Sequence, residues 1–170
     1  MDKKEGYVIK FGDNINTDII SPPQYMELGI EASAPYAMSA LDLDFAEKVK
    51  EKKIMVAGDN FGSGSSRETS PLTLKYLGVE AIVAKFFARI FYRNAINVGL
   101  LVVECKEAGQ IQENDRIRID CREGKIQNLT RNEEYCCTKI PEHLLKLMEA
   151  GGLVNYLKEE LQGETVHGNL

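Results

Sequence analysis

The chain has 170 residues, 44% of them hydrophobic, which is enough for one globular domain with a substantial core. A net charge of −5 and an isoelectric point near 5.2 argue against nucleic acid as the main partner. No apolar run of about 18 residues would cross a membrane, and the N-terminus lacks the apolar core of a signal peptide. We expect a cytoplasmic protein with a single domain over residues 1–170, a core at about 6–161 and a frayed tail at 162–170.

The first part of the chain predicts a strand, a long irregular loop and a helix. Residues 6–11 alternate apolar and other side chains, as in a strand. Residues 12–40 are rich in Pro, Gly and Ser, and a loop of this length is usually functional or disordered. Leu41, Phe45 and Val49 recur at every fourth position, which predicts an amphipathic helix over 41–50.

Alternation of strands and helices predicts a mainly parallel sheet in the middle of the chain. Ser70 is expected to cap a helix, with Pro71 in its first position and Gly78 after its end. The expected elements are a strand at 53–57, a glycine-rich loop at 58–68, a helix at 70–77, a strand at 81–84, a helix at 87–97 and a strand at 100–104.

The last part of the chain predicts a hairpin followed by a helix. Residues 116–120 alternate cleanly, and a Glu-Gly turn lets residues 125–129 pair back on them. A helix then begins at Pro141 and ends at Gly151-Gly152. The cysteines, Cys105, Cys121, Cys136 and Cys137, contain no C-x-x-C pair and fit neither zinc nor iron–sulfur spacing. We expect reduced structural thiols and no metal site in this chain.

The glycine-rich loop is the strongest functional signal. A strand, a glycine loop and a helix together present backbone N–H groups to an anion. The loop also carries the hydroxyls of Ser65 and Ser66 and the guanidinium of Arg67, which can bind a carboxylate through two hydrogen bonds. A serine beside that arginine could move a proton on the bound acid. The loop therefore predicts an enzyme site for a small carboxylate.

Other interpretations of the loop fit less well. It lacks the Lys of a phosphate-binding Walker loop, the third glycine of a dinucleotide site and the G-x-S-x-G of a hydrolase. The two histidines, His143 and His167, lie in an expected helix and tail, which disfavours a Ser-His triad. The remaining alternative is a glycine-rich surface turn with serines.

Together with residues 14–22 and 85–90, the loop resembles the swivel domain of the aconitase superfamily. Residues 97–101 and 150–157 extend the resemblance over most of the chain, and the length resembles standalone small subunits of the isopropylmalate dehydratase and homoaconitase type. The resemblance implies an α/β fold of the three-layer β/β/α swivelling type, like the aconitase C-terminal domain, with a mainly parallel sheet and a C-terminal hairpin.

The resemblance also implies roles for individual residues. Ser65 matches the alkoxide base that removes a proton alpha to a carboxylate, with Ser66 and loop N–H groups holding the alkoxide. Arg67 matches the arginine that binds the substrate carboxylate. Asp18 is expected at the substrate site, holding an arginine or orienting the loop, with an Asx-turn cap as the alternative. Glu68 and Arg89 are possible supporting residues, and the role of Thr69 is open because relatives often have His or Gln there. Lys85, Arg89 and Arg93 either bind a shared anion or form a basic surface that faces solvent or a partner.

The segment Tyr25-Met26-Glu27-Leu28 bears on the substrate. Homoaconitases have Tyr-Leu-Arg-Thr here, and that Arg binds a distal carboxylate. Glu27 would repel such a carboxylate, whereas Met26 and Leu28 suit an alkyl substituent. The resemblance therefore favours 3-isopropylmalate dehydratase, of leucine biosynthesis, and leaves open dimethylmalate, citramalate or citraconate, and homoaconitate.

The resemblance implies a partner. No cofactor is expected in this chain; a [4Fe–4S] cluster is expected in a large subunit, in a heterodimer or heterotetramer that acts on a 2-hydroxydicarboxylate. A non-catalytic anion-binding or regulatory module is the alternative from another class.

Overall fold

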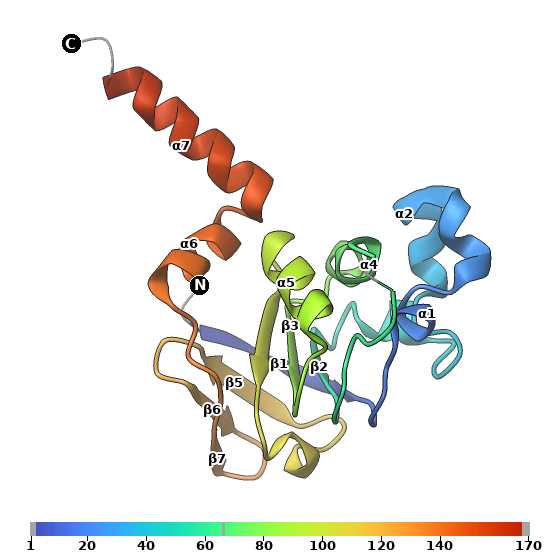
Figure 1. Ribbon diagram of the computed structural model, residues 1–170. Coiled ribbons are helices and arrows are strands. Elements are labelled where there is room, and N and C mark those ends of the chain that lie inside the picture. The colour runs from blue at the N-terminus through green and yellow to red at the C-terminus, as the bar shows by residue number, and fades with distance from the viewer. Residues whose placement is uncertain (1–2, 66, 168–170) are drawn as a thin grey trace.

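A seven-stranded mixed sheet organises the chain, and the computed structural model describes residues 3–65 and 67–167 of it (Figure 1). The strand order is β4-β3-β2-β1-β5-β6-β7, so the first strand lies at the centre. The strands are β1 (Lys3–Lys10), β2 (Ile54–Val56), β3 (Ala81–Ala84), β4 (Leu101–Glu104), β5 (Arg116–Asp120), β6 (Lys125–Asn128) and β7 (Glu133–Cys136).

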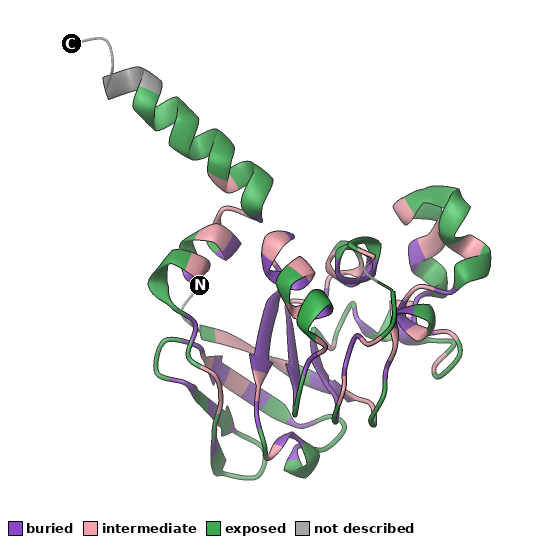
Figure 2. Ribbon diagram, viewed as in Figure 1, coloured by how far each residue is buried: buried purple, intermediate pink, exposed green. Residues whose placement is uncertain are grey.

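The helices vary widely in length. The α-helices are α1 (Thr17–Ile20), α2 (Gly29–Ser33), α3 (Phe45–Lys48), α4 (Thr69–Leu77), α5 (Arg89–Asn97), α6 (Glu142–Glu149) and α7 (Leu153–His167). Short 3₁₀ helices are η1 (Pro23–Leu28), η2 (Ala34–Tyr36) and η3 (Ala108–Gln110). The longest, α7, extends away from the sheet and is largely exposed (Figures 1 and 2). In the described part of the chain, no helix is long and apolar enough to cross a membrane.

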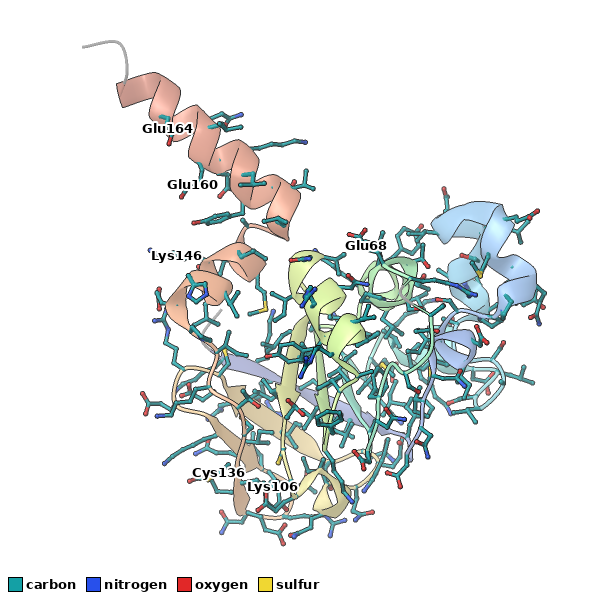
Figure 3. All side chains as sticks on the ribbon, viewed as in Figure 1. Glu68, Lys106, Cys136, Lys146, Glu160 and Glu164 are labelled. Atoms are coloured by element: carbon teal, nitrogen blue, oxygen red, sulfur yellow. The ribbon has the colours of Figure 1, made fainter. Side chains whose placement is uncertain are left out.

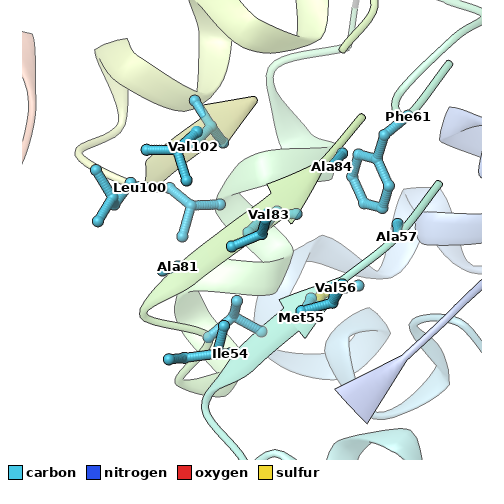
Figure 4. Close-up of a cluster of buried hydrophobic side chains, with 14 of the residues drawn as sticks. Ile54, Met55, Val56, Ala57, Phe61, Ala81, Val83, Ala84, Leu100 and Val102 are labelled. Carbon is cyan, nitrogen blue, oxygen red and sulfur yellow. The ribbon is translucent and has the colours of Figure 1, made fainter. Parts of the chain in front are cut away.

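Strands β1 to β4 form the parallel half of the sheet. Every residue of β2 and β3 is buried, as expected for parallel strands covered on both faces. Side chains such as Ile54, Val83 and Val102 fill the core between these strands and their neighbours (Figure 4). The β-α-β-α-β order predicted from the sequence is confirmed.

Strands β5, β6 and β7 form the antiparallel half, joined to the parallel half by β1. Ile117, Ile119 and Ile126 are buried in the common core, while residues alternating with them are exposed or half-buried. One face of this half is therefore open to solvent, and the other covers the parallel strands. Helices, parallel strands and antiparallel strands make the expected β/β/α layers, and β7 adds a third strand to the predicted hairpin.

Three local predictions were wrong. The segment 12–40 is not irregular throughout, because α1, η1, α2 and η2 lie in it. The helix expected over 41–50 is α3 alone; Phe45 and Val49 are buried, but Leu41 is 53% exposed. The tail expected at 162–170 is helical to His167, where the described residues end.

The start of α4 also differs from the prediction. The helix begins at Thr69, with Glu68 in the N-cap position, so Ser70 lies in its first turn. The Ser70 hydroxyl is buried and has no hydrogen-bond partner within the described residues. Gly78 ends α4 in the left-handed conformation, as expected, with φ of 105°.

Candidate active site

Two loops cross at the carboxyl edge of the parallel strands. One follows β1 and the other follows β2, and because these parallel strands are neighbours, their loops meet. Four backbone hydrogen bonds of 2.7–3.0 Å join them: Gly58 N–H to Gly12 O, Asn14 N–H to Asp59 O, Gly62 N–H to Ile15 O, and Thr17 N–H to Ser63 O. The crossing holds the start of α1 against the predicted catalytic loop.

Gly64 allows the two loops to approach closely at Thr17. Its φ of 115° lies in the left-handed region that favours glycine. A Cβ added there would lie 2.8 Å from Thr17 Oγ1, so a side chain would displace that hydroxyl. The glycine thus leaves room for the contact between Thr17 and the next residue, Ser65.

Thr17 holds Ser65 through two contacts. The Ser65 backbone N–H donates to Thr17 Oγ1 at 3.2 Å, and the two hydroxyl oxygens lie 3.3 Å apart. Thr17 is 2% exposed, whereas Ser65 is exposed at the surface. The buried threonine therefore fixes a serine that remains open to a ligand. Sequence reasoning assigned no role to Thr17, although its place just before Asp18 was a usable signal.

Arg67 is positioned by residues of the segment 16–28. Its Nη1 lies 3.4 Å from Asp18 Oδ1 and contacts Met26 Sδ. The Arg67 side chain is 28% exposed and that of Asp18 is 60% exposed, so the pair orients the guanidinium rather than stabilising the fold. Asp18 is not the cap of α1, because Asn16 Oδ1 accepts the Ile19 N–H at 2.9 Å.

The segment predicted to read the substrate, residues 25–28, lies on η1. Among the described contacts of this segment, it is Met26 that touches Arg67. Tyr25 stacks on Tyr36 with ring centroids 3.9 Å apart, while Glu27 is exposed and Leu28 is 56% exposed. A small cavity of about 80 Å³ separates this segment from α4; it is lined by Ser21, Pro22, Met26, Gly29, Ile30, Ser33, Thr69 and Thr73.

The other predicted site residues contribute no contact to the loop crossing that the structure describes. Ser66 falls outside the described residues. Glu68 is exposed at the start of α4, and the acidic partner of Arg67 is Asp18 instead. Arg89 is exposed at the start of α5. The Lys85 ammonium lies beside Gly109 of η3.

The cysteines do not fit an iron–sulfur cluster. They are thiols rather than disulfides, and among the described residues no three His, Cys, Asp or Glu side chains form a metal site. Burial raises the pKa of Cys105 to about 11 and that of Cys137 to about 12, which disfavours the thiolates that a cluster requires. Cys136 lies well away from Glu68 at the start of α4 (Figure 3).

Comparisons with known proteins agree with this geometry. The aconitase C-terminal domain model matches residues 14–108. The 3-isopropylmalate dehydratase small subunit 1 of Thermotoga maritima is 51% identical over 156 residues, covering 91% of this chain and 94% of that protein. The corresponding small subunit of Brachyspira hyodysenteriae is 45% identical over 158 residues, covering 92% and 97%.

A solved structure extends the match to three dimensions. The crystal structure of 3-isopropylmalate dehydratase from Methanocaldococcus jannaschii superposes with a TM-score of 0.90 at 39% identity, covering 97% of this chain and 99% of that one. The predicted family and fold are confirmed. The chain belongs to the aconitase C-terminal domain family, and within it to the 3-isopropylmalate dehydratase small subunits.

Proposed function

We propose that this chain is the small subunit of a two-subunit hydro-lyase that interconverts 2- and 3-isopropylmalate by dehydration and rehydration in the cytoplasm. The observation that carries the proposal is the crossing itself. It places an exposed serine, held by a buried threonine, in the same loop as an arginine that Asp18 orients. That arrangement suits proton transfer on a bound carboxylate.

In this proposal, each residue of the crossing has a defined task. Arg67 binds a substrate carboxylate, because its guanidinium keeps N–H groups available beyond the contact with Asp18. Ser65 takes the proton alpha to that carboxylate. A serine hydroxyl is a poor base, so its alkoxide needs preorganised donors, and the Thr17 hydroxyl is 3.3 Å from Ser65 Oγ. Ser66 is assigned to the same task.

The partner in this proposal is a large subunit carrying a [4Fe–4S] cluster, in a heterodimer or heterotetramer. The burial of Cys105 and Cys137 supports placing the cluster outside this chain. The cluster would supply the Lewis acid for the departing hydroxide. Thiols in place of disulfides are consistent with a cytoplasmic enzyme.

The test is a reconstitution of the holoenzyme with wild-type and Ser65→Ala small subunits. We expect kcat for isopropylmalate to fall about 10²- to 10⁴-fold, since the variant lacks the general base. Ser63→Ala is the matched control, because it removes a neighbouring hydroxyl but keeps the carbonyl that accepts the Thr17 N–H at 2.8 Å. Near-normal turnover by Ser65→Ala would instead favour a non-catalytic anion-binding or regulatory module.

Substrate choice is assigned to η1. Met26 and Leu28 present apolar surface where a distal carboxylate would be repelled by Glu27, which favours an alkylmalate. Glu27→Arg should raise the relative kcat/KM for homocitrate-type substrates by about 10- to 100-fold, through one charge-assisted hydrogen bond of roughly 1.5–3 kcal/mol. Glu31→Arg on α2 has the same charge change and serves as the control.

The measurement is a competition between isopropylmalate, dimethylmalate, citramalate and homocitrate-type substrates for each holoenzyme. An unchanged preference in Glu27→Arg would remove η1 from the substrate site. Faster turnover of dimethylmalate or citramalate than of isopropylmalate by the wild-type enzyme would reassign the substrate within the alkylmalates.

A further inference from the structure

The outer side of α5 and the segment just before this helix expose both apolar and basic side chains. Phe86 is 53% exposed and Ile90 is 50% exposed, and both alternate with the exposed arginines Arg89 and Arg93. The opposite side of α5 buries Phe91, Ala95 and Ile96 in the core. The outer residues Phe86, Arg89, Ile90 and Arg93, called here the α5 surface, are therefore available to a partner.

The two arginines of the α5 surface differ from the other arginines of the chain. Each of the others forms an ion pair: Arg67 with Asp18, Arg116 and Arg118 with Glu5, Arg122 with Glu142, and Arg131 with Asp115. Within the part of the chain that the structure describes, Arg89 and Arg93 have no acidic partner. These two guanidinium groups lie on a helix that also exposes Ile90 and that follows the exposed Phe86, in a chain of net charge −5, and together they indicate a surface for an acidic partner.

The α5 surface is rigidly joined to the loop that carries Ser65. The Phe61 N–H donates to Phe86 O at 3.0 Å, and the Ala88 N–H donates to Phe61 O at 2.8 Å. The Phe61 and Phe91 rings pack edge to face with centroids 5.2 Å apart. The α5 surface and the loop that carries Ser65 are therefore held in a fixed relative position, so a partner that contacts both needs little movement between them.

We propose that the α5 surface is a docking site for the cluster-bearing large subunit. This inference rests on the proposed function, which requires another chain to face Ser65. Phe86 and Ile90 insert into an apolar patch of that subunit, and Arg89 and Arg93 pair with carboxylates around it. Aromatic residues and arginines dominate the binding energy of many interfaces, and charged rims accelerate association.

The apolar part of the proposal is tested with the double variant Phe86→Ser/Ile90→Ser. The affinity of each small subunit for the purified large subunit is measured by calorimetric titration, with turnover at saturating large subunit as a second readout. We expect association to weaken about 10- to 100-fold while kcat at saturation is retained. The matched control is Tyr7→Ser/Leu129→Ser, which removes side chains 50% and 40% exposed on β1 and just after β6.

The basic part is tested with Arg89→Glu/Arg93→Glu against Lys146→Glu/Lys158→Glu, exposed lysines of α6 and α7 that give the same change in net charge. We expect a loss of affinity for the α5 variant that shrinks as ionic strength rises beyond about 0.15 M. The control pair should lose less than about threefold.

The outcomes separate this inference from the proposed function. Equal losses in the α5 and control variants, or wild-type affinity in both α5 variants, would overturn the docking site while leaving the effect of Ser65→Ala intact. If the α5 variants lost self-association in ultracentrifugation but bound the large subunit normally, the surface would join two copies of this chain, which also overturns the proposal. Weakened binding without any wild-type turnover would retain the docking site and refute the function.

Discussion

Glycines bring chain segments into close contact at several places in this molecule, and two of these contacts have different consequences. At the loop crossing, Gly64 makes room for the Thr17 hydroxyl. At the junction of α5, α6 and α7, a Cβ added to Gly152 would lie 2.6 Å from Asn97 O, so this glycine makes room for the backbone itself. The first contact positions exposed side chains, and the second holds helices together.

The helix junction is further reinforced by Lys75 of α4. Its ammonium donates to Val98 O at 2.6 Å and to Gly151 O at 3.0 Å, both at helix ends. Burial lowers the pKa of Lys75, because desolvation penalises the charged form. The junction thus contains a desolvated charge and tight backbone contacts, whereas the crossing presents the exposed Ser65 to solvent. Changes at the junction should cost stability, and changes at the crossing should cost activity.

The largest expected loss of stability is that of Gly152→Ala. Its φ of 121° strains any other residue, and a backbone oxygen 2.6 Å from the added Cβ can move away only if the backbone shifts. We therefore expect the free energy of unfolding to fall by about 3 kcal/mol, with unchanged kcat per folded enzyme. Chemical denaturation measures this. Gly163→Ala in α7 is the control; nothing lies within 4 Å of its added Cβ, and it should stabilise by about 0.5–1 kcal/mol.

Gly64→Ala should have a smaller effect on folding and a clear effect on turnover. Here the added Cβ meets the Thr17 side chain, which can move, so we expect about 1–2 kcal/mol of destabilisation from the positive φ. Moving Thr17 displaces Ser65, and kcat should fall at least about 10-fold. Gly12→Ala, with nothing within 4 Å, is the control. Unchanged kcat in Gly64→Ala would dissociate the crossing from catalysis.

Thr17→Val is the mildest change, because it keeps the buried shape and removes one hydroxyl. We expect a loss of about 1 kcal/mol in the free energy of unfolding and a decrease in kcat of about 10-fold, with KM little changed. Thr138→Val removes a comparable hydroxyl, which the Glu104 N–H contacts at 3.1 Å, far from the crossing in the sequence. A loss of kcat in both variants would mean that the effect is structural.

The parallel half of the fold was predictable because its strands are short apolar runs separated by helix signals. Ser65 and Arg67 were predicted as site residues from the sequence, because glycines, serines and an arginine occur together in one loop. Thr17 was not, since its contact with Ser65 spans 48 residues and depends on how two loops cross. Strand β7 was also missed, because in Glu133–Cys136 only Tyr135 is buried and the alternation is too weak to detect.

The central place of β1 has a consequence for synthesis of the protein. This strand leaves the ribosome before both of its neighbours, since it pairs with Ile54–Val56 on one edge and with Arg116–Asp120 on the other. Until β5 emerges, a nascent chain carries an unpaired strand edge beside an apolar core, a state prone to intermolecular pairing. Translation stalled before β5 would thus yield a fragment that aggregates or needs a chaperone, whereas a pause after β7 would release a sheet complete on both sides.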